Sequence, residues 1–141
     1  MPQRILILCT GNSARSQMAE GLLRELSHAT IDVQSAGTAP SRVNPLAVQA
    51  MAERGIDISH HRSKHLNEFL KTPFDVVITV CDQAAEACPV FPGKAERIHW
   101  SFSDPAAAQG TTEEQLAAFR KTRNALEEHL RAWLEERKDS L

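Results

Sequence analysis

The chain has 141 residues, of which 42% are hydrophobic and 24% are charged, and its formal net charge is -2. This length favours a single domain over residues 1–141, large enough to bury a core without disulfide or metal support. The charge pattern shows no basic run that would indicate a nucleic-acid partner, and no stretch reaches the roughly 18 apolar residues of a membrane span. The first apolar run, Ile5–Leu8, is too short for a signal peptide. We therefore expect a cytoplasmic monomer.

Strands and helices are predicted to alternate in the first half of the chain: a strand at Ile5–Leu8, a helix from about Ser16 to Ser27, a strand at Ile31–Ser35 closed by Gly37, and a helix from Asn44-Pro45 to about Gly55. The strongest boundary is Asn44-Pro45, since asparagine is a good N-cap and proline suits the first helical position.

The second half continues this alternation: a short helix at Lys64–Leu70, a strand at Phe74–Val80, a helix over Asp82–Ala87, a weak strand at Arg97–His99 and a long helix from Thr111. Phe74–Val80 is apolar on both faces, as expected of a central parallel strand. Glu114 lies three residues after Thr111 and completes a capping box. The alternation predicts an α/β fold with a mostly parallel sheet.

The segment Cys9–Ser16 (CTGNSARS) joins the first predicted strand to the first helix and has the features of an oxyanion-binding loop. A helix N-terminus offers backbone N–H groups and the positive end of the helix dipole to an anion. Five residues separate Cys9 from Arg15, enough to curl around one tetrahedral anion, and the guanidinium can bind two of its oxygens. The predicted oxyanion-binding residues are Thr10, Gly11, Asn12, Ser13, Ala14 and Arg15.

Cys9, at the head of this loop, is the predicted nucleophile. A thiol at a helix N-terminus beside an arginine ionises more readily than a free thiol. Ser16 is placed to donate a hydrogen bond to the sulfur. The alternative is a buried cysteine at a strand end with Arg15 on the helix surface. The occurrence of strand, Cys-x5-Arg-Ser motif and helix in register favours the catalytic interpretation.

Cys81 and Cys88 form a second candidate redox group, because three cysteines in a chain of this size are too few for a disulfide scaffold. Cys81 follows the predicted central strand and so should lie at the same sheet edge as Cys9. In a helix, positions seven apart differ in height by about 10.5 Å, whereas a disulfide needs Cα atoms within roughly 7 Å. The two cysteines can therefore bond only if the segment between them unwinds. Two alternatives remain open: inert core cysteines, or a zinc site, which would need two further ligands from His60, His61, His65 and His99, none of which has a recognised ligand spacing.

These motifs resemble the low-molecular-weight tyrosine phosphatases, and within that superfamily the thioredoxin-coupled arsenate reductases. The resemblance rests on CTGNSARSQMAEG at Cys9–Gly21, SAG at Ser35–Gly37, NP at Asn44-Pro45, IDIS at Ile56–Ser59, HWSFSDPA at His99–Ala106 and the Cys81/Cys88 pair. It covers nearly the whole chain and implies a single-domain, three-layer sandwich: a four-stranded, mostly parallel sheet with helices on both faces. One departure is Ala14, where many relatives carry a further cysteine outside the redox three.

The resemblance also implies a function, the reduction of arsenate to arsenite for arsenic detoxification. Cys9 would attack arsenic, and the disulfide would pass from Cys9–Cys81 to Cys81–Cys88. The resemblance makes Asp104 the general acid, whereas the Asp104-Pro105 pair by itself would indicate only the start of a turn. The expected reductant is thioredoxin, no cofactor is expected, and phosphate or sulfate should mimic arsenate. A weak phosphatase activity should persist. The phosphatases resembled here usually follow Asp-Pro with an aromatic residue, whereas this chain has Ala106 and no tyrosine, so a small inorganic anion fits better.

Three other functions remain open from the sequence. A phosphomonoesterase would hydrolyse the Cys9 adduct, but it would not use Cys81 and Cys88. A non-enzymatic redox sensor or anion-binding module would have no use for a leaving-group acid such as Asp104. A glutathione- or mycothiol-coupled reductase would normally lack one of the later cysteines.

A second departure concerns a cation site. Some of the reductases resembled here bind potassium through residues that map to Asn12, Glu20, Ser35 and an acidic residue at position 64. In this chain position 64 is Lys64. A lysine ammonium is a compact cation on a flexible stem. We therefore predict that no metal binds and that Lys64 fills the place of potassium beside Glu20; the alternative is a solvated Lys64 and a lost site.

Overall fold

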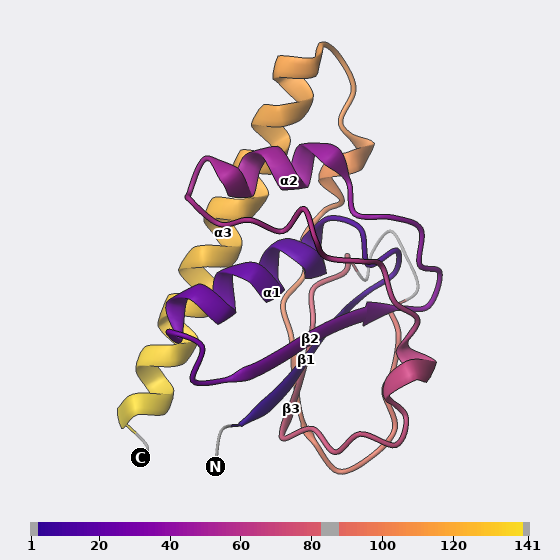
Figure 1. Ribbon diagram of the computed structural model, residues 1–141, viewed down its shortest axis with the longest axis vertical. Helices are drawn as coiled ribbons and strands as arrows, with labels where there is room; N and C mark the ends of the chain where they lie inside the picture. The colour runs from indigo at the N-terminus through magenta and orange to yellow at the C-terminus, as the bar shows by residue number, and fades with distance from the viewer. Residues whose placement is uncertain (1–2, 83–87, 140–141) are drawn as a thin grey trace.

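The computed structural model describes residues 3–82 and 88–139 and is built on a four-stranded sheet (Figure 1). The strands are β1 (Arg4–Cys9), β2 (Asp32–Gly37), β3 (Val76–Thr79) and β4 (Glu96–His99). Their order in the sheet is β2-β1-β3-β4, and every neighbouring pair is parallel. The α/β class and the parallel sheet predicted from the sequence are thus confirmed, including the weak fourth strand.

Both faces of the sheet are covered, but unequally. Side chains alternate along β1, so Ile5 and Ile7 pack on one face with the helices α1 (Arg15–Leu26), α2 (Pro45–Ala52) and α3 (Thr112–Asp139). Leu6 and Leu8 pack on the other face with Phe91 and the 3₁₀ turn η1 (Leu66–Phe69). Figure 1 shows the three α-helices together on one side of the sheet. No helix in the described part of the chain is long and apolar enough to cross a membrane.

The capping signals read from the sequence are present in the structure. The Asn44 side chain accepts a hydrogen bond from the Leu46 N–H at 2.8 Å, and α2 begins at Pro45. The Thr111 and Glu114 side chains each accept from the other's backbone N–H, at 3.1 and 3.2 Å, as a capping box requires.

The helix predicted at Lys64–Leu70 is wrong in extent, because only the 3₁₀ turn Leu66–Phe69 forms. The Lys64 carbonyl accepts from the Gly37 N–H at 2.9 Å, and the next residue, His65, forms a parallel bridge with Gly37. Residue 64 is therefore held in extended conformation beside β2 and cannot begin a helix. The helix predicted over Asp82–Ala87 lies outside the described residues, apart from Asp82.

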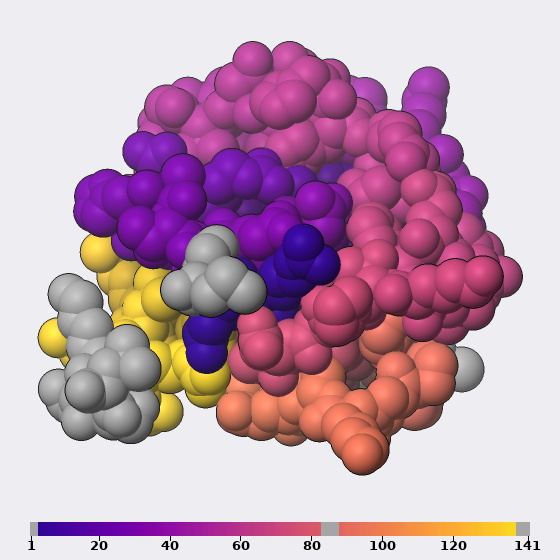
Figure 2. Space-filling model, turned by 60° about the horizontal axis from the view of Figure 1, so that its bottom comes forward, coloured from indigo at the N-terminus to yellow at the C-terminus, as the bar shows by residue number. Residues whose placement is uncertain are grey.

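The carboxyl ends of three strands place the candidate site. Cys9 ends β1, Thr79 ends β3 two residues before Cys81, and His99 ends β4. The strands are parallel, so these residues meet at one edge of the sheet. Both termini lie at the opposite end (Figure 1). Figure 2 views that end, where a cavity of about 460 Å³ is lined by residues 70–75 and 91–95, remote from Cys9.

Candidate active site

The loop between β1 and α1 is anchored to the surrounding segments by hydrogen bonds to its carbonyl groups. All four carbonyls of residues 10–13 accept hydrogen bonds, from Ala39 N, Ser41 N, Ser63 Oγ and Asn44 N respectively, at 2.6–3.2 Å. In a trans peptide the N–H points opposite to the C=O. The N–H groups of residues 11–14 therefore face the inside of the loop. Such a ring of amides is a site for a tetrahedral anion.

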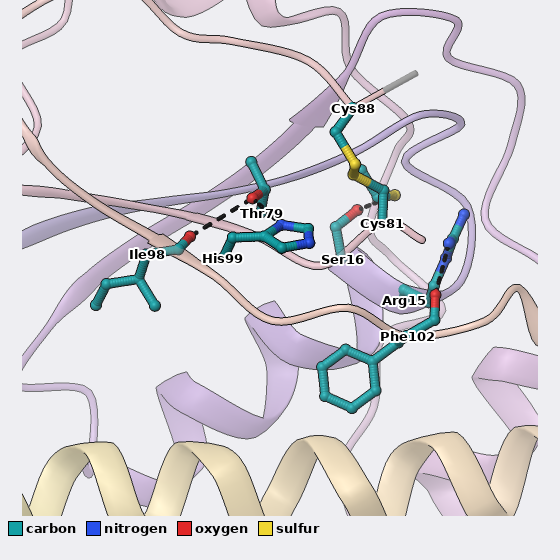
Figure 3. The surroundings of a disulfide bond; sticks show 9 residues. Arg15, Ser16, Thr79, Cys81, Cys88, Ile98, His99 and Phe102 are labelled. Atoms are coloured by element: carbon teal, nitrogen blue, oxygen red, sulfur yellow. Dashed lines mark hydrogen bonds between the residues drawn. A yellow bond between two sulfur atoms is a disulfide. The ribbon is translucent and has the colours of Figure 1, made fainter. Parts of the chain in front are cut away.

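The N-terminus of α1 and Arg15 border the same space. Alanine at the N-cap, Ala14, has no side-chain acceptor for the first helical N–H groups, so an anion can take that role. The Arg15 side chain is only 4% exposed, and its Nη1 donates to the Phe102 carbonyl at 3.0 Å (Figure 3). This contact brings the segment before Asp104 against the anion loop.

The Cys9 sulfur lies at the end of a short chain of side-chain hydrogen bonds. Ser16 Oγ lies 2.9 Å from Cys9 Sγ, and Asn12 Nδ2 donates to Ser16 Oγ at 2.8 Å. Since the serine oxygen accepts from Asn12, its own proton is directed at the sulfur. A hydrogen bond to sulfur favours the thiolate. The sequence prediction that Ser16 donates to Cys9 agrees with this geometry.

The same Asn12 amide is connected by hydrogen bonds to a buried carboxylate. Asn12 Nδ2 also donates to Ser35 Oγ at 3.0 Å, and Ser35 Oγ donates to Glu20 Oε1 at 2.6 Å. The Asn12 Oδ1 accepts from the Lys64 N–H at 2.8 Å, which fixes which end of the amide carries oxygen. The three residues of the predicted cation site, Asn12, Glu20 and Ser35, thus lie together.

Three cationic or protonatable groups surround Glu20. Arg24 Nη2 donates to Glu20 Oε2 at 2.8 Å, and Lys64 Nζ lies 3.9 Å from Oε1. His61 Nε2 lies 3.6 Å from Oε2. The closest countercharge is therefore Arg24, which the sequence reasoning missed, although its spacing of four residues from Glu20 on a helix is a recognised pairing signal.

Burial disfavours charge in this cluster. It lowers the pKa of Lys64 below its ordinary value, with Glu20 acting in the opposite direction. It also lowers the pKa of His61, again against the pull of Glu20 and with further lowering by Arg24. His61 Nδ1 lies 2.9 Å from Gln17 Oε1, and Gln17 Nε2 donates to Asn12 Oδ1 at 2.9 Å, so the ring is tied back to the anion loop.

The second pair of cysteines is bonded in the structure. Cys81 and Cys88 form a disulfide with Cα atoms 5.9 Å apart, while Cys9 is a buried free thiol. This Cα separation is within the roughly 7 Å that a disulfide requires. The Cys81, Cys88 and His99 ligand atoms lie within 4.8 Å of one another, but the two sulfurs are bonded together rather than available as thiolates.

Asp104 lies on the exposed segment before α3. Its Oδ1 accepts from the Ala106 N–H at 2.9 Å and so caps the 3₁₀ turn η2 (Pro105–Ala107). The Arg15–Phe102 hydrogen bond anchors this segment two residues earlier. The carboxyl group is thus on a fixed turn whose base touches the anion loop.

Residues 4–140 match the family described as low molecular weight phosphotyrosine protein phosphatase. The chain belongs to this family. It is 47% identical over 131 residues to an arsenate reductase of Halalkalibacterium halodurans, covering 93% of this chain and 94% of the relative. It is 44% identical over the same length to an arsenate reductase of Bacillus subtilis, with the same coverage. A solved structure described as an arsenate reductase in the phosphate binding state superposes with a TM-score of 0.80 at 32% identity, covering 95% of this chain and 98% of the other.

Membership of the phosphatase family confirms the resemblance inferred from the sequence. The structure places Ser16 against Cys9, bonds Arg15 to the Phe102 carbonyl and joins Cys81 to Cys88. The sequence reasoning did not name Gln17 and Arg24 as site residues, and it considered His61 and His99 only as possible zinc ligands. Only Arg24 had a local signal. His61 and His99 reach the site through contacts between segments distant in sequence, which no local pattern reveals. Gln17 follows Ser16 directly and bonds both Asn12 and the distant Arg62 carbonyl.

Proposed function

We propose that this member of the phosphatase family is an arsenate reductase that passes a disulfide from Cys9 through Cys81 to Cys88. The observation that carries the proposal is the Cys81–Cys88 disulfide at the sheet edge where β1 ends in the free thiol Cys9. A phosphomonoesterase needs only the nucleophile, the anion loop and an acid. A second, bonded pair of cysteines has a use when the reaction consumes electrons.

The first step is nucleophilic attack on a bound oxyanion. Arsenate has the shape and charge of phosphate, so the inward N–H groups of residues 11–14 and the Arg15 fork bind its oxygens. The Cys9 thiolate, favoured by Ser16, attacks arsenic. Asp104 protonates the departing hydroxyl, which leaves as water. The product is a covalent Cys9–arsenic adduct.

The relay supplies the two electrons. The Cys81 thiolate attacks Cys9 Sγ, and the sulfur–arsenic bond breaks with its electron pair left on arsenic. Arsenic(V) becomes arsenite, and a Cys9–Cys81 disulfide forms. Cys88 then attacks Cys81, which releases the Cys9 thiolate and leaves the Cys81–Cys88 disulfide. Cys88 is less buried than Cys81, so the oxidised bond has moved toward solvent.

Regeneration needs a dithiol from outside, and we propose thioredoxin in the cytoplasm, where thiols are kept reduced. The chain itself needs no cofactor. The named arsenate reductases at 44–47% identity and the related structure in a phosphate binding state support both the reaction and the anion.

The test is arsenate reduction followed through NADPH consumption with thioredoxin reductase and thioredoxin, beside a glutathione–glutaredoxin system. We expect turnover with the first system. Cys9→Ser should abolish it, because an alcohol is not ionised near neutral pH. Cys88→Ser should stop after one turnover with a Cys9–Cys81 bond, detected by mass spectrometry. A Cys9–Cys88 bond in the arsenate-treated wild type would contradict the order of the relay.

The phosphatase machinery should leave a weak side activity, since the anion loop and Asp104 suit a phosphate ester as well. We expect slow hydrolysis of p-nitrophenyl phosphate. Asp104→Ala should lower this rate and arsenate turnover together, by roughly 10²-fold or more for a general acid. Asp75→Ala is the matched control at the other end of the sheet, where the carboxylate accepts from the Arg4 N–H. Full activity of Asp104→Ala would place the acid elsewhere.

A further inference from the structure

His99 lies beside the redox pair and has one ring nitrogen without a partner. Its Nδ1 is 2.6 Å from Thr79 Oγ1 on the neighbouring strand. Its Nε2 is buried and has no hydrogen-bond partner among residues 3–82 and 88–139. The Cys81 and Cys88 sulfurs and a nitrogen of the ring lie within 4.8 Å of one another. Figure 3 shows the ring pointing from Thr79 toward the disulfide.

A buried nitrogen without a partner costs free energy, so most are paired in folded proteins. Packing alone would be served better here by an apolar residue. A thiol relay, in contrast, releases and takes up protons at this place. Imidazole is the side chain that most readily exchanges a proton near neutral pH.

We propose that His99 is the proton acceptor and donor for the Cys81 thiol. The inference rests on the proposed function, because it assigns a proton transfer to that relay. Before Cys81 attacks Cys9, its S–H proton passes to His99 Nε2, and the resulting thiolate is the nucleophile. The proton stays on the imidazolium while the Cys81–Cys88 disulfide exists.

The return step closes the proton cycle. An external dithiol attacks the Cys88 sulfur, the more exposed of the two, and forms a mixed disulfide with it. The Cys81–Cys88 bond breaks, and its electron pair goes to Cys81 Sγ. The His99 Nε2–H proton then neutralises that thiolate. A leaving thiolate that is protonated or hydrogen-bonded as it departs leaves faster.

Thr79 keeps the ring in a suitable tautomer throughout. Thr79 Oγ1 lies 3.5 Å from the Ile98 carbonyl and 2.6 Å from His99 Nδ1, and in the tautomer that we propose it donates to the carbonyl and accepts from the His99 Nδ1–H. The neutral ring then carries its lone pair on Nε2, the side of the sulfurs. Protonation adds a hydrogen at Nε2 and leaves the bond to Thr79 unchanged. No rearrangement is needed in either direction.

Other titratable or charged side chains come from the elements around this imidazole. Cys9 from β1, Arg15 from α1 and Asp82 beside Cys81 come from the elements next to the disulfide, and His129 of α3 packs on Trp100 and Phe102. Any of these can displace the pH at which the step titrates. The test therefore compares variants across a pH range and does not rely on one value.

The experiment measures reduction of the oxidised full-length protein by dithiothreitol between pH 5.5 and 8.5, with EDTA present to keep metal ions off the released thiols. His99→Gln keeps a polar atom near Nε2 but cannot exchange a proton. We expect it to slow reduction about 10-fold or more at pH 6.5 and to lose one titration from the pH profile. His28→Gln, in the exposed loop before β2, is the matched control and should keep the wild-type profile.

A purely structural role for His99 predicts a lower Tm in His99→Gln with an unchanged pH profile, and that result would overturn the proposal. If His99→Gln does not fold, Thr79→Val keeps the imidazole but removes the hydroxyl that orients it. It should slow reduction less than His99→Gln and shift the titration; a wild-type profile would overturn the proposal. Arsenate turnover of the wild type is measured separately. Its absence would refute the proposed function, while the dithiothreitol profile would still report on His99.

Discussion

Gly37 is where β2 comes closest to the anion loop, and a single added methyl group there tests how tightly the loop is held. It pairs with Cys9 across the sheet. A β-carbon at position 37 would collide with the Thr10 carbonyl oxygen and lie 2.8 Å from the Cys9 carbonyl oxygen. Both neighbours are backbone, and the Thr10 oxygen is itself fixed by the Ala39 N–H at 2.9 Å. Gly37→Ala therefore cannot be accommodated by a rotamer change.

The expected loss of stability depends on which atoms must move to make room for the added methyl group. Overpacking a rigid site typically costs about 1–3 kcal/mol. In a chain of this size each kcal/mol shifts Tm by roughly 3–5 °C, so we expect a loss of about 3–15 °C. The structure can relieve this clash only by displacing the Thr10 peptide, which belongs to the oxyanion site. A displacement of ~1 Å there would cost about 10²-fold in kcat/KM for arsenate.

Gly21→Ala is the matched control, since it adds the same atom inside α1. Its β-carbon would meet Met51 Cε at 3.1 Å, the far end of a flexible side chain, and Ile58 Cγ2 at 2.9 Å, a side-chain methyl group, whereas at Gly37 both neighbours are backbone atoms. The helix gains up to ~1 kcal/mol from replacing glycine. We expect a Tm within about 5 °C of wild type and unchanged kcat/KM. The test compares the Tm and the kcat/KM for arsenate of the two variants with those of the wild type. A Gly37→Ala enzyme equal to wild type in both would refute the close approach.

The remaining predictions concern the charge cluster around Glu20. We propose that Arg24 and Lys64 together supply the positive charge that potassium would otherwise bring to Glu20. Turnover and Tm should therefore be the same in sodium and potassium chloride at one ionic strength, and the Tm of Lys64→Asp should rise with potassium. A wild type activated by potassium over sodium would contradict this proposal. His61 has a lowered pKa through burial, so the unfolded chain binds a proton below about pH 6.5 while the folded chain does not. Stability should therefore fall from pH 7 towards the lower pKa of the folded state, and His61→Gln, measured by Tm over pH 7 to 5, should lose less; an equal loss in both would show that another group is responsible.

The parts of the fold that the sequence predicted are those whose signals are local. Asn44-Pro45 and the Thr111–Glu114 box fix helix starts through contacts within three residues. The Cys9–Ser16 loop could be placed because a strand and a helix border it directly. Parallel pairing then needed only the rule that successive strands joined by helices run the same way.

What the sequence could not predict depends on contacts between distant segments. The helix assigned to Lys64–Leu70 has favourable residues, yet Lys64 is held extended by Gly37 and Asn12, 27 and 52 positions away. The same contact brings the Lys64 ammonium toward Glu20. The side chain of His99 reaches the redox pair only because β4 pairs with β3. In each case tertiary pairing overrides or adds to the local preference.

Asn12 explains why the anion loop and the buried charge cluster behave as one unit. Its amide donates to both Ser16 and Ser35, and its oxygen accepts from the Lys64 N–H. An aspartate has no protons to donate, and a serine has too few to serve both hydroxyls. The residue also sits at φ 47°, a conformation that asparagine tolerates better than most side chains. Glu20 is therefore connected to the Cys9 sulfur by one continuous chain of hydrogen bonds through Ser35, Asn12 and Ser16. A substitution that displaces the Glu20 carboxylate should consequently disturb the orientation of Asn12, and with it the anion loop.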